Sequence, residues 1–389
     1  MSQVAQEKDL AFPVAEFRRR LGVVQEGIGR LGVDAAIVVG PENLFYLTGY
    51  ETIGYSAFQL AVVPAGGEPR LLVRELERGA ARRLSWMASE PATIQDGADP
   101  VDAVVELVRE LGLERSRLGV DRSSWFLTVD QYLHLVERLP GATVVDSSGL
   151  VERARRVKSE LELDCIRAAA RYTEAGMCAG IDAIHAGAMD NEVGAAAAEA
   201  IFAAGSEYMS IAPIVTAGTR SGVAHTTFVR RRIEAGDAVL LEMGAVHRRY
   251  AGPLMRSAVV GPPSDLARRM YDACSRALDA AIAAIRPGAI AGDVHAACQR
   301  VIDGAGFEPN FRKRLGYSVG VGFAPDWGEG HFLHLSAGDP TVLEAGMVFH
   351  MPPALREYAV VGVGCSETVA VVPDGVEVVT DFPRELAIR

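Results

Sequence analysis

The stretch DAVLLEMGAVHRRYAGPLMRSAVVG, residues 237–261, begins as a buried strand and then places a carboxylate in the middle of it. The apolar run 238–241 is typical of a strand with both faces covered, and Glu242 follows it directly. A buried, ionised carboxylate without a partner is so costly that it takes up a proton instead. Glu242 therefore requires a cation, a network of donors or a metal ion.

The composition is that of an ordinary globular protein. The chain has 389 residues, of which 49% are apolar and 23% charged, which is enough for two or three domains. Its net charge of −11 argues against nucleic acid or an anionic membrane as a partner. The N-terminal residues lack an apolar signal segment, and no run approaches the roughly 18 apolar residues of a membrane helix. We therefore expect a cytoplasmic protein, with its five scattered cysteines as core residues and no zinc cluster or disulfide.

The first part of the chain alternates between helical and strand patterns. Residues 14–31 have helical spacing, 34–39 form a short apolar strand, and 41–50 are rich in turn residues and predict a loop. Two strands around a Gly-rich turn follow in 58–76, and another strand in 116–121. This pattern predicts an N-terminal α/β domain at residues 1–154.

The pattern changes at residue 150, where 150–177 predict one long amphipathic helix. Ala-rich helices, strand-like runs, a second pair of helices and further strands follow. A helix pair with a strand pair is thus used twice, which suggests an internal pseudo-repeat. Periodicity alone indicates an α+β domain at residues 155–389.

Four segments in this second domain carry a family resemblance: AHTTFVRRRIEAGDAVLLEMGA, YAGPLMRSAVVG, LGYSVGVGF and LEAGMVFHMPP with GCSETVAVV. In this order they resemble the catalytic domain of the creatinase and prolidase superfamily, which has the pita-bread fold and follows an α/β N-terminal domain. Within it, NLFYLTGY, the RRYAGPLMR run and GYSVGVGFAPDWGEG are most similar to ectoine hydrolases.

The resemblance also locates a metal cage. Metallopeptidases of the superfamily bind two metal ions through Asp, Asp, His, Glu and Glu, a set suited to divalent cations that activate water. Those five positions carry Glu242, Pro253, Tyr317, Pro352 and Ser366 here. Proline offers no side-chain ligand, and a hydroxyl or a phenol is a poor one. We therefore predict no metal and no other cofactor.

Two residues are the predicted catalytic pair. His225 lies seventeen residues before Glu242, and the matching histidine of creatinase is the proton shuttle; a pKa near 6.5 suits that task. A lone histidine is otherwise a core or surface residue. Ectoine hydrolases open a cyclic amidine, whose cation would pair with Glu242; Glu242 would stabilise that charge or attack as a nucleophile. The alternative for Glu242 is an internal salt bridge to Arg249 or Arg256.

Further residues are candidates for substrate binding. Tyr317 has room among glycines to project its phenol, Arg256 would bind a substrate carboxylate, and Glu367 lies beside a former ligand position. Arg256 is equally well explained by an internal salt bridge, and Glu367 by a strand-end acid. Asp326 and Trp327 follow a proline in a loop, where an aromatic ring lines a pocket or covers the core.

The superfamily also implies a homodimer in which N-terminal loop residues cover the partner's site. Tyr55 and Phe58 lie in the equivalent loop and would exclude water from it. Alternatively, their rings belong to the core of their own domain.

The function that these residues predict is metal-independent hydrolysis of a C–N bond in a small, zwitterionic cyclic amidine or related amino-acid derivative. One alternative is a metal-dependent Xaa-Pro dipeptidase or aminopeptidase, which needs bound metal. Another is a non-catalytic binding module of the same fold, in which replacing His225 would change no activity.

Overall fold

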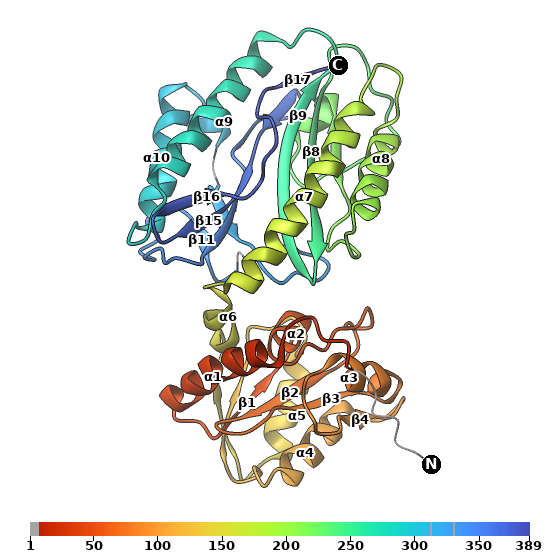
Figure 1. Ribbon diagram of the computed structural model, residues 1–389, viewed down its shortest axis with the longest axis vertical. Coiled ribbons are helices and arrows are strands. Elements are labelled where there is room, and N and C mark those ends of the chain that lie inside the picture. Colours follow the sequence, from red (N-terminus) through yellow and green to blue (C-terminus); the bar gives the residue numbers. More distant parts are fainter. Residues whose placement is uncertain (1–7, 312, 330) are drawn as a thin grey trace. The chain divides into compact units, whose positions relative to one another are not determined.

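The computed structural model describes residues 8–311, 313–329 and 331–389. The chain divides into two compact units, Met1–Arg155 and Arg156–Arg389, which are coloured from red to yellow and from yellow-green to blue in Figure 1. Each unit has a core of its own. No helix in the described part of the chain is both long and apolar enough to cross a membrane.

The N-terminal unit is a six-stranded sheet with helices packed on it. The strand order is β4-β3-β2-β1-β5-β6; β2 is antiparallel to both β1 and β3, and the other pairs are parallel. The strands are β1 (Ala35–Val38), β2 (Leu60–Pro64), β3 (Arg70–Arg74), β4 (Ala92–Ile94), β5 (Arg117–Val120) and β6 (Thr143–Asp146). The helices are α1 (Val14–Leu31), α2 (Pro41–Thr48), η1 (Glu75–Glu77), α3 (Arg78–Leu84), α4 (Pro100–Glu110), α5 (Val129–Arg138) and α6 (Leu150–Arg155).

Two sequence-based expectations about helices are wrong. The predicted loop at 41–50 is helix α2: Pro41 opens the helix with its fixed φ, and Gly49 ends it in the left-handed conformation at φ 80°. The predicted single helix over 150–177 is two helices. Ser159 accepts from the backbone N–H of Glu162, whose side chain accepts from the N–H of Ser159 in return. This capping box starts a new helix.

The C-terminal unit combines two sheets, a two-stranded ribbon and two helix pairs. The sheet orders are β17-β9-β8-β7 and β11-β10-β12-β15-β16, and β13 pairs with β14. The strands are β7 (Ile214–Ala217), β8 (Ala238–His247), β9 (Tyr250–Val259), β10 (Gly316–Ser318), β11 (His334–Leu335), β12 (Val348–Met351), β13 (Ala354–Glu357), β14 (Val361–Gly364), β15 (Glu367–Val372), β16 (Gly375–Val378) and β17 (Ala387–Ile388). The helices are α7 (Glu160–Asp182), α8 (Asp190–Ala203), η2 (Gly218–Gly222), α9 (Asp265–Ala284), α10 (Ala291–Gly304) and η3 (Glu308–Asn310).

Each helix pair of this unit packs on its own set of strands. Helix α7 lies against β8 and β9 and α8 against α7 and β7, on the right in Figure 1, while α9 contacts the ribbon strands β13 and β14, and α10 contacts α9 and β11. Met177, Val193 and Leu241 share the first core, and Leu278 and Phe349 share the second. All five cysteines are free thiols, and four of them are buried. Strand β8 is an interior strand of its sheet, between β7 and β9.

The long hairpin β8–β9 is closed by a turn whose residues are not typical turn residues. Arg248 and Arg249 take left-handed conformations, at φ 48° and 63°, which cost residues with a Cβ some stability. The carboxylate of Glu207 compensates by accepting from both backbone N–H groups, at 2.7 and 3.1 Å. Inside the turn, the fully buried Arg249 donates to the carbonyls of Tyr208 and Gly322. The hairpin that carries Glu242 is thereby fixed at its tip.

The β13–β14 ribbon touches the short helix η2 backbone to backbone. A Cβ on Gly362 would lie 1.9 Å from the carbonyl oxygen of Ser221, and the Gly362 N–H donates to the Ser221 hydroxyl at 2.9 Å. Only glycine permits this approach. The contact joins the ribbon to the segment that leads directly into His225.

We expect Gly362→Ala to lower the thermal unfolding temperature of the C-terminal unit. The added methyl group has to push two backbones apart, and overpacking of this kind costs about 1–3 kcal/mol. The matched control is Gly304→Ala at the end of α10, where a Cβ meets nothing within 4 Å. Equal melting temperatures for the two variants in calorimetry would contradict the close approach.

Candidate active site

The centre of the candidate site is Glu242, halfway along β8. The register pairs it with Ile214 of β7 and Met255 of β9, and its side chain is half-buried among buried neighbours. Within the described residues its carboxylate makes no hydrogen bond and no ion pair. Burial raises the pKa of Glu242, while the charges of Lys313 and Arg356 hold it down. The carboxylate therefore lies in a positive field without a direct partner.

Lys313 and Arg356 are the site residues that sequence reasoning missed. Burial by the surrounding protein and, after it, the positive charge of Arg356 lower the pKa of Lys313 to about 8, although solvent still reaches the lysine. The ammonium donates to the carbonyl of Pro352 at 2.7 Å. Burial also lowers the pKa of Arg356, on β13, and Glu242 opposes that effect. The three charged groups therefore act on one another.

No local pattern marks those two cations. Lys313 lies in the basic run FRKRL, of the kind that normally forms a solvated face. Each has a weak signal in hindsight. Lysine is rare in this chain, which contains only three, and Arg356 lies four positions after Pro352, a position where the family has a metal ligand.

His225 lies in the loop that follows η2. Its ring is exposed, and its positive charge when protonated lowers the pKa of Glu242. The backbone is left-handed at φ 56°, a conformation that costs a non-glycine residue of order 1 kcal/mol or more and that is enriched at functional sites. His225 is therefore within electrostatic reach of Glu242, and the catalytic role of the pair stays a prediction.

Tyr317 borders the site, but its hydroxyl is already engaged. Trp327 Nε1 donates to the Tyr317 hydroxyl at 2.9 Å, and that hydroxyl lies 2.9 Å from His350 Nδ1. The negative charge of Glu242 helps to raise the pKa of Tyr317, after burial. Since the phenol accepts a hydrogen bond from Trp327, its own O–H donates to His350 Nδ1.

The network continues to Ser366. His350 Nε2 lies 2.7 Å from the Ser366 hydroxyl, which also accepts from the backbone N–H of Met255 at 2.6 Å. Because Nδ1 of His350 accepts a hydrogen bond, Nε2 carries the ring proton and donates to Ser366. Burial lowers the pKa of His350 to about 3, so its ring is neutral at ordinary pH. Trp327, Tyr317, His350 and Ser366 therefore form one chain of uncharged groups.

Asp326 and Trp327 lie next to each other with different surroundings. Trp327 is buried and packs with Val246 and Ala251, so its ring is part of the core as well as the partner of Tyr317. Asp326 is exposed and accepts from the N–H of Gly328 at 2.9 Å. Its charge raises the pKa of Glu242, which places Asp326 at the edge of the site.

Two family models match this chain. Residues 164–373 match the model of metallopeptidase family M24, and residues 20–157 match the creatinase/prolidase N-terminal domain. The chain belongs to the M24 family. The predicted fold, an α/β N-terminal domain followed by a pita-bread domain, is confirmed, and the protein is a hydrolase of this family.

Relatives in the family span the whole chain. An uncharacterized hydrolase/peptidase of Sinorhizobium fredii is 33% identical over 97% of each chain. The ectoine hydrolase of Halomonas elongata is 27% identical over 98% of this chain and 99% of its own. Among solved structures, dipeptidase PepE of Mycobacterium ulcerans has a TM-score of 0.83 and 26% identity, covering 97% of this chain and 99% of that one. A prolidase of Thermococcus sibiricus, at 23% identity and covering 96% and 99%, shares the fold with a TM-score of 0.86.

The M24 family implies metal ions, and the residues of this chain do not fit them. Of the five ligand positions, Pro253 and Pro352 offer no side-chain donor, and Tyr317 and Ser366 are bound into the neutral network around His350. Within the part of the chain that the structure describes, no three His, Cys, Asp or Glu side chains are grouped to hold an ion. Glu242 is left as the single acidic group of the former set.

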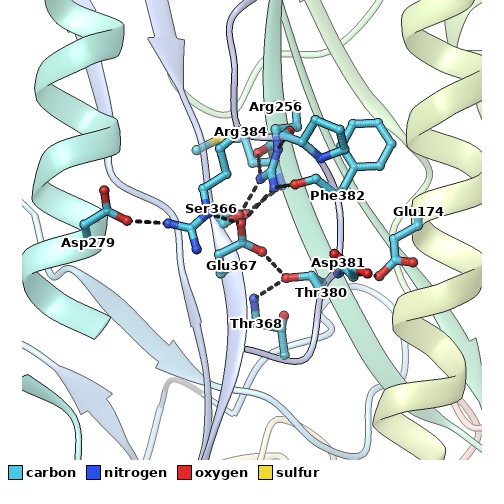
Figure 2. Close-up of polar contacts among 12 residues, drawn as sticks. Glu174, Arg256, Asp279, Ser366, Glu367, Thr368, Thr380, Asp381, Phe382 and Arg384 are labelled. Atoms are coloured by element: carbon cyan, nitrogen blue, oxygen red, sulfur yellow. Dashed lines mark hydrogen bonds and ion pairs between the residues drawn. The ribbon is translucent and has the colours of Figure 1, made fainter. Parts of the chain in front are cut away.

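Arg256 forms a closed cluster with Glu367, as Figure 2 shows. Arg256 Nη2 donates to Glu367 at 2.8 Å, and both side chains are only 1% exposed. All five guanidinium N–H groups have acceptors; the other four are the carbonyls of Met255, Ser366, Phe382 and Pro383.

Glu367 is equally occupied. It also accepts from Arg384 Nε at 2.8 Å and from the Thr380 hydroxyl, and Arg384 in turn pairs with Asp279. The geometry therefore favours an internal salt bridge over substrate binding for both Arg256 and Glu367. Because Arg249 and Arg256 have these other partners, the internal salt bridge considered for Glu242 is not formed.

Tyr55 and Phe58 pack within the N-terminal unit. The Tyr55 ring meets Phe126 edge-on at a centroid distance of 6.3 Å, and Phe58 packs against the core of the sheet. Their role over a partner's site stays a prediction.

We expect Arg256→Met to destabilise the protein by about 3–5 kcal/mol, because it leaves a buried carboxylate short of its main partner. Glu367→Met has a similar effect, and the double variant loses much less than the sum of the two, as urea unfolding would measure. The control is Arg268→Met, whose pair with Asp265 is exposed and contributes at most about 1 kcal/mol. Additive losses, or an Arg256→Met protein that is stable but binds no substrate, would contradict the structural role.

Proposed function

We propose that this protein is a metal-independent hydrolase that cleaves a C–N bond of a small cyclic amidine or related amino-acid derivative, as an ectoine hydrolase does. The observation that carries the proposal is the unpartnered carboxylate of Glu242 beside His225. A protonated amidine is a flat, delocalised cation with two N–H donors, and a carboxylate facing it forms a bidentate, charge-assisted pair. The substrate cation thus becomes the direct partner that the Glu242 carboxylate lacks within the protein.

The chemistry follows from these two side chains. Glu242 holds the amidinium in place and stabilises its charge. His225 takes a proton from water as the water oxygen bonds to the amidine carbon, and it returns that proton to the ring nitrogen as the C–N bond breaks. In the alternative course, a Glu242 oxygen bonds to the amidine carbon first, and the ring C–N bond breaks as protonated His225 gives its proton to the ring nitrogen. His225 then takes a proton from water as the water oxygen bonds to the same carbon, and the bond from that carbon to the Glu242 oxygen breaks, which restores the carboxylate. Both courses use the same two residues and no metal ion.

The ectoine hydrolase of Halomonas elongata supports this proposal, since its similarity extends over 98% of the chain. A second candidate is favoured by other relatives, among them an Xaa-Pro dipeptidase of Pyrococcus furiosus that is 25% identical over 95% of this chain and 99% of its own. The prolines at positions 253 and 352 argue against it, because a metallopeptidase needs carboxylate ligands there. The homodimer and the cytoplasmic location stay predictions.

We expect His225→Ala and Glu242→Gln to lower kcat/KM for ectoine by at least about 100-fold, the usual contribution of a general base or of electrostatic stabilisation. Melting temperatures should stay close to that of the wild type, because neither side chain makes a hydrogen bond in the described structure. His185→Ala and Glu234→Gln change exposed residues of the same types and serve as controls. Full activity of His225→Ala on every substrate tested would contradict the proposal.

We also expect hydrolysis to survive removal of metal ions. After dialysis against a chelator, elemental analysis should find far less than one transition-metal ion per chain, and the rate should be unchanged by added Mn²⁺, Co²⁺ or Zn²⁺. The substrates are ectoine, hydroxyectoine, creatine and Xaa-Pro dipeptides. Activity that is lost on chelation and restored by metal, with dipeptides as the best substrates, would favour the second candidate.

A further inference from the structure

Lys313 and Arg356, the two cations of the site, take no part in the proposed hydrolysis. Lys313 donates to one backbone carbonyl, and Arg356 has a buried Nε without any hydrogen-bond partner. Neither side chain forms an ion pair within the described residues. Nearby, Glu242 and, at the edge of the site, Asp326 carry negative charges, and in the described part of the chain neither makes an ion pair with Lys313 or Arg356.

Two fully buried cations of the unit have a carboxylate as a direct partner. Lys158 pairs with Glu329 at 2.7 Å and Arg256 with Glu367 at 2.8 Å, each pair being 1% exposed. This is the usual arrangement, because a desolvated charge without a counterion destabilises the fold. Arg356, which is partly buried with a buried Nε, and Lys313, which solvent still reaches, have no carboxylate as a direct partner among the described residues. An anion that is not part of the protein would supply that partner.

The positions of the two cations suit a bound anion. Lys313 lies three residues before the start of β10 of the five-stranded sheet, Arg356 is on β13 of the ribbon, and Glu242 is on β8 of the other sheet. Leu240 of β8 and Ala354 of β13 share a small buried cluster. Each lies two residues before Glu242 or Arg356, on the same face of its strand, so the two charged side chains lie on the side where β8 and β13 pack together. Glu242 and Arg356 change each other's pKa, and both change the pKa of Lys313. A guanidinium fork matches a carboxylate in two parallel hydrogen bonds.

We propose that Lys313 and Arg356 form a carboxylate subsite that binds the negative end of the substrate while Glu242 binds its positive end. This inference rests on the proposed function and defines its substrate class: a compact zwitterion whose carboxylate lies next to the cationic C–N group. It assigns to Arg356 and Lys313 the role that the sequence suggested for Arg256. An amidine without a carboxylate binds poorly, since it leaves both cations unpaired.

The first experiment observes Lys313 directly. The chain has three lysines, Lys8, Lys158 and Lys313, so reductive methylation with ¹³C-formaldehyde gives few NMR signals, and Lys313→Arg identifies the one of interest. We expect sodium acetate and ectoine each to shift the Lys313 signal in a saturable way and to raise its pKa, because a bound anion favours the charged amine. Signals of Lys8 and Lys158 should stay in place. No response of Lys313 to either compound would overturn the subsite.

The second experiment measures selectivity by calorimetry, with ectoine and its decarboxylated analogue 2-methyl-tetrahydropyrimidine as probes. A charged hydrogen-bonded pair contributes about 1.5–3 kcal/mol, so the wild type should prefer ectoine by about 10- to 100-fold. Arg356→Gln should abolish most of that preference by weakening ectoine binding alone, with Arg356→Lys intermediate. Arg286→Gln, which removes an exposed charge on the same unit, should behave as the wild type.

The outcomes separate the subsite from the proposed function. If ectoine neither binds nor reacts while acetate still shifts Lys313 in an Arg356-dependent way, the carboxylate subsite stands and the cyclic-amidine substrate falls. If ectoine is hydrolysed but Arg356→Gln keeps the full preference for the carboxylate, the subsite falls and the hydrolase stands. The melting temperature of ligand-free Arg356→Gln should equal or exceed that of the wild type, since an unmatched charge is removed; a large decrease would show a structural role instead.

Discussion

The structure depends on one constraint: a carboxylate is held in a long central strand without a direct partner. Backbone pairing on both sides fixes Glu242 in register, so the side chain cannot withdraw to solvent without breaking the sheet. Burial raises its pKa, and the field of Lys313, Arg356 and His225 opposes that rise. Such a group is poorly stabilised in the free protein and well prepared to meet a cation. A charged group that is held in position before the ligand binds is preorganised for that ligand.

The surrounding architecture explains how a family fold persists after its ligand positions have changed. Where M24 metallopeptidases require carboxylates and a histidine, this chain has two prolines, a phenol and a hydroxyl. The neutral chain through Tyr317, His350 and Ser366 satisfies the polar groups that remain there. The buried pair of Arg256 and Glu367 joins β9 to β15, and so links the two sheets. The paired charges lie in the core, and the charges without a direct partner lie at the candidate site, so we propose that stability and function use separate sets of charges.

Much of the fold was predictable, because hydrophobic periodicity and motif order are local or nearly local signals. Glu242 and His225 could be placed together since the spacing of the family motifs fixes both. The exceptions are instructive. Pro41 and Gly49 look like loop residues but serve as helix ends, and the capping box at Ser159 divides what periodicity alone reads as one helix.

The chemistry of single side chains was less accessible. Arg256 is saturated by carbonyls from residues 366, 382 and 383, more than a hundred positions away, and no local pattern encodes such contacts. Lys313 and Arg356 come from segments that are adjacent only after the sheets and the ribbon have assembled. A residue that looks like a substrate ligand thus becomes part of the core, and two that look like surface charges become part of the site.

The most direct test of the central claim is the affinity of ectoine for chelator-treated protein, measured by titration calorimetry for the wild type and for Glu242→Gln. If the substrate is the missing partner of the carboxylate, the metal-depleted wild type binds ectoine saturably, and the variant binds it at least about tenfold more weakly, as expected for the loss of a charged pair. Equal affinities for the two proteins, or binding that appears only after divalent metal is added back, would contradict the account.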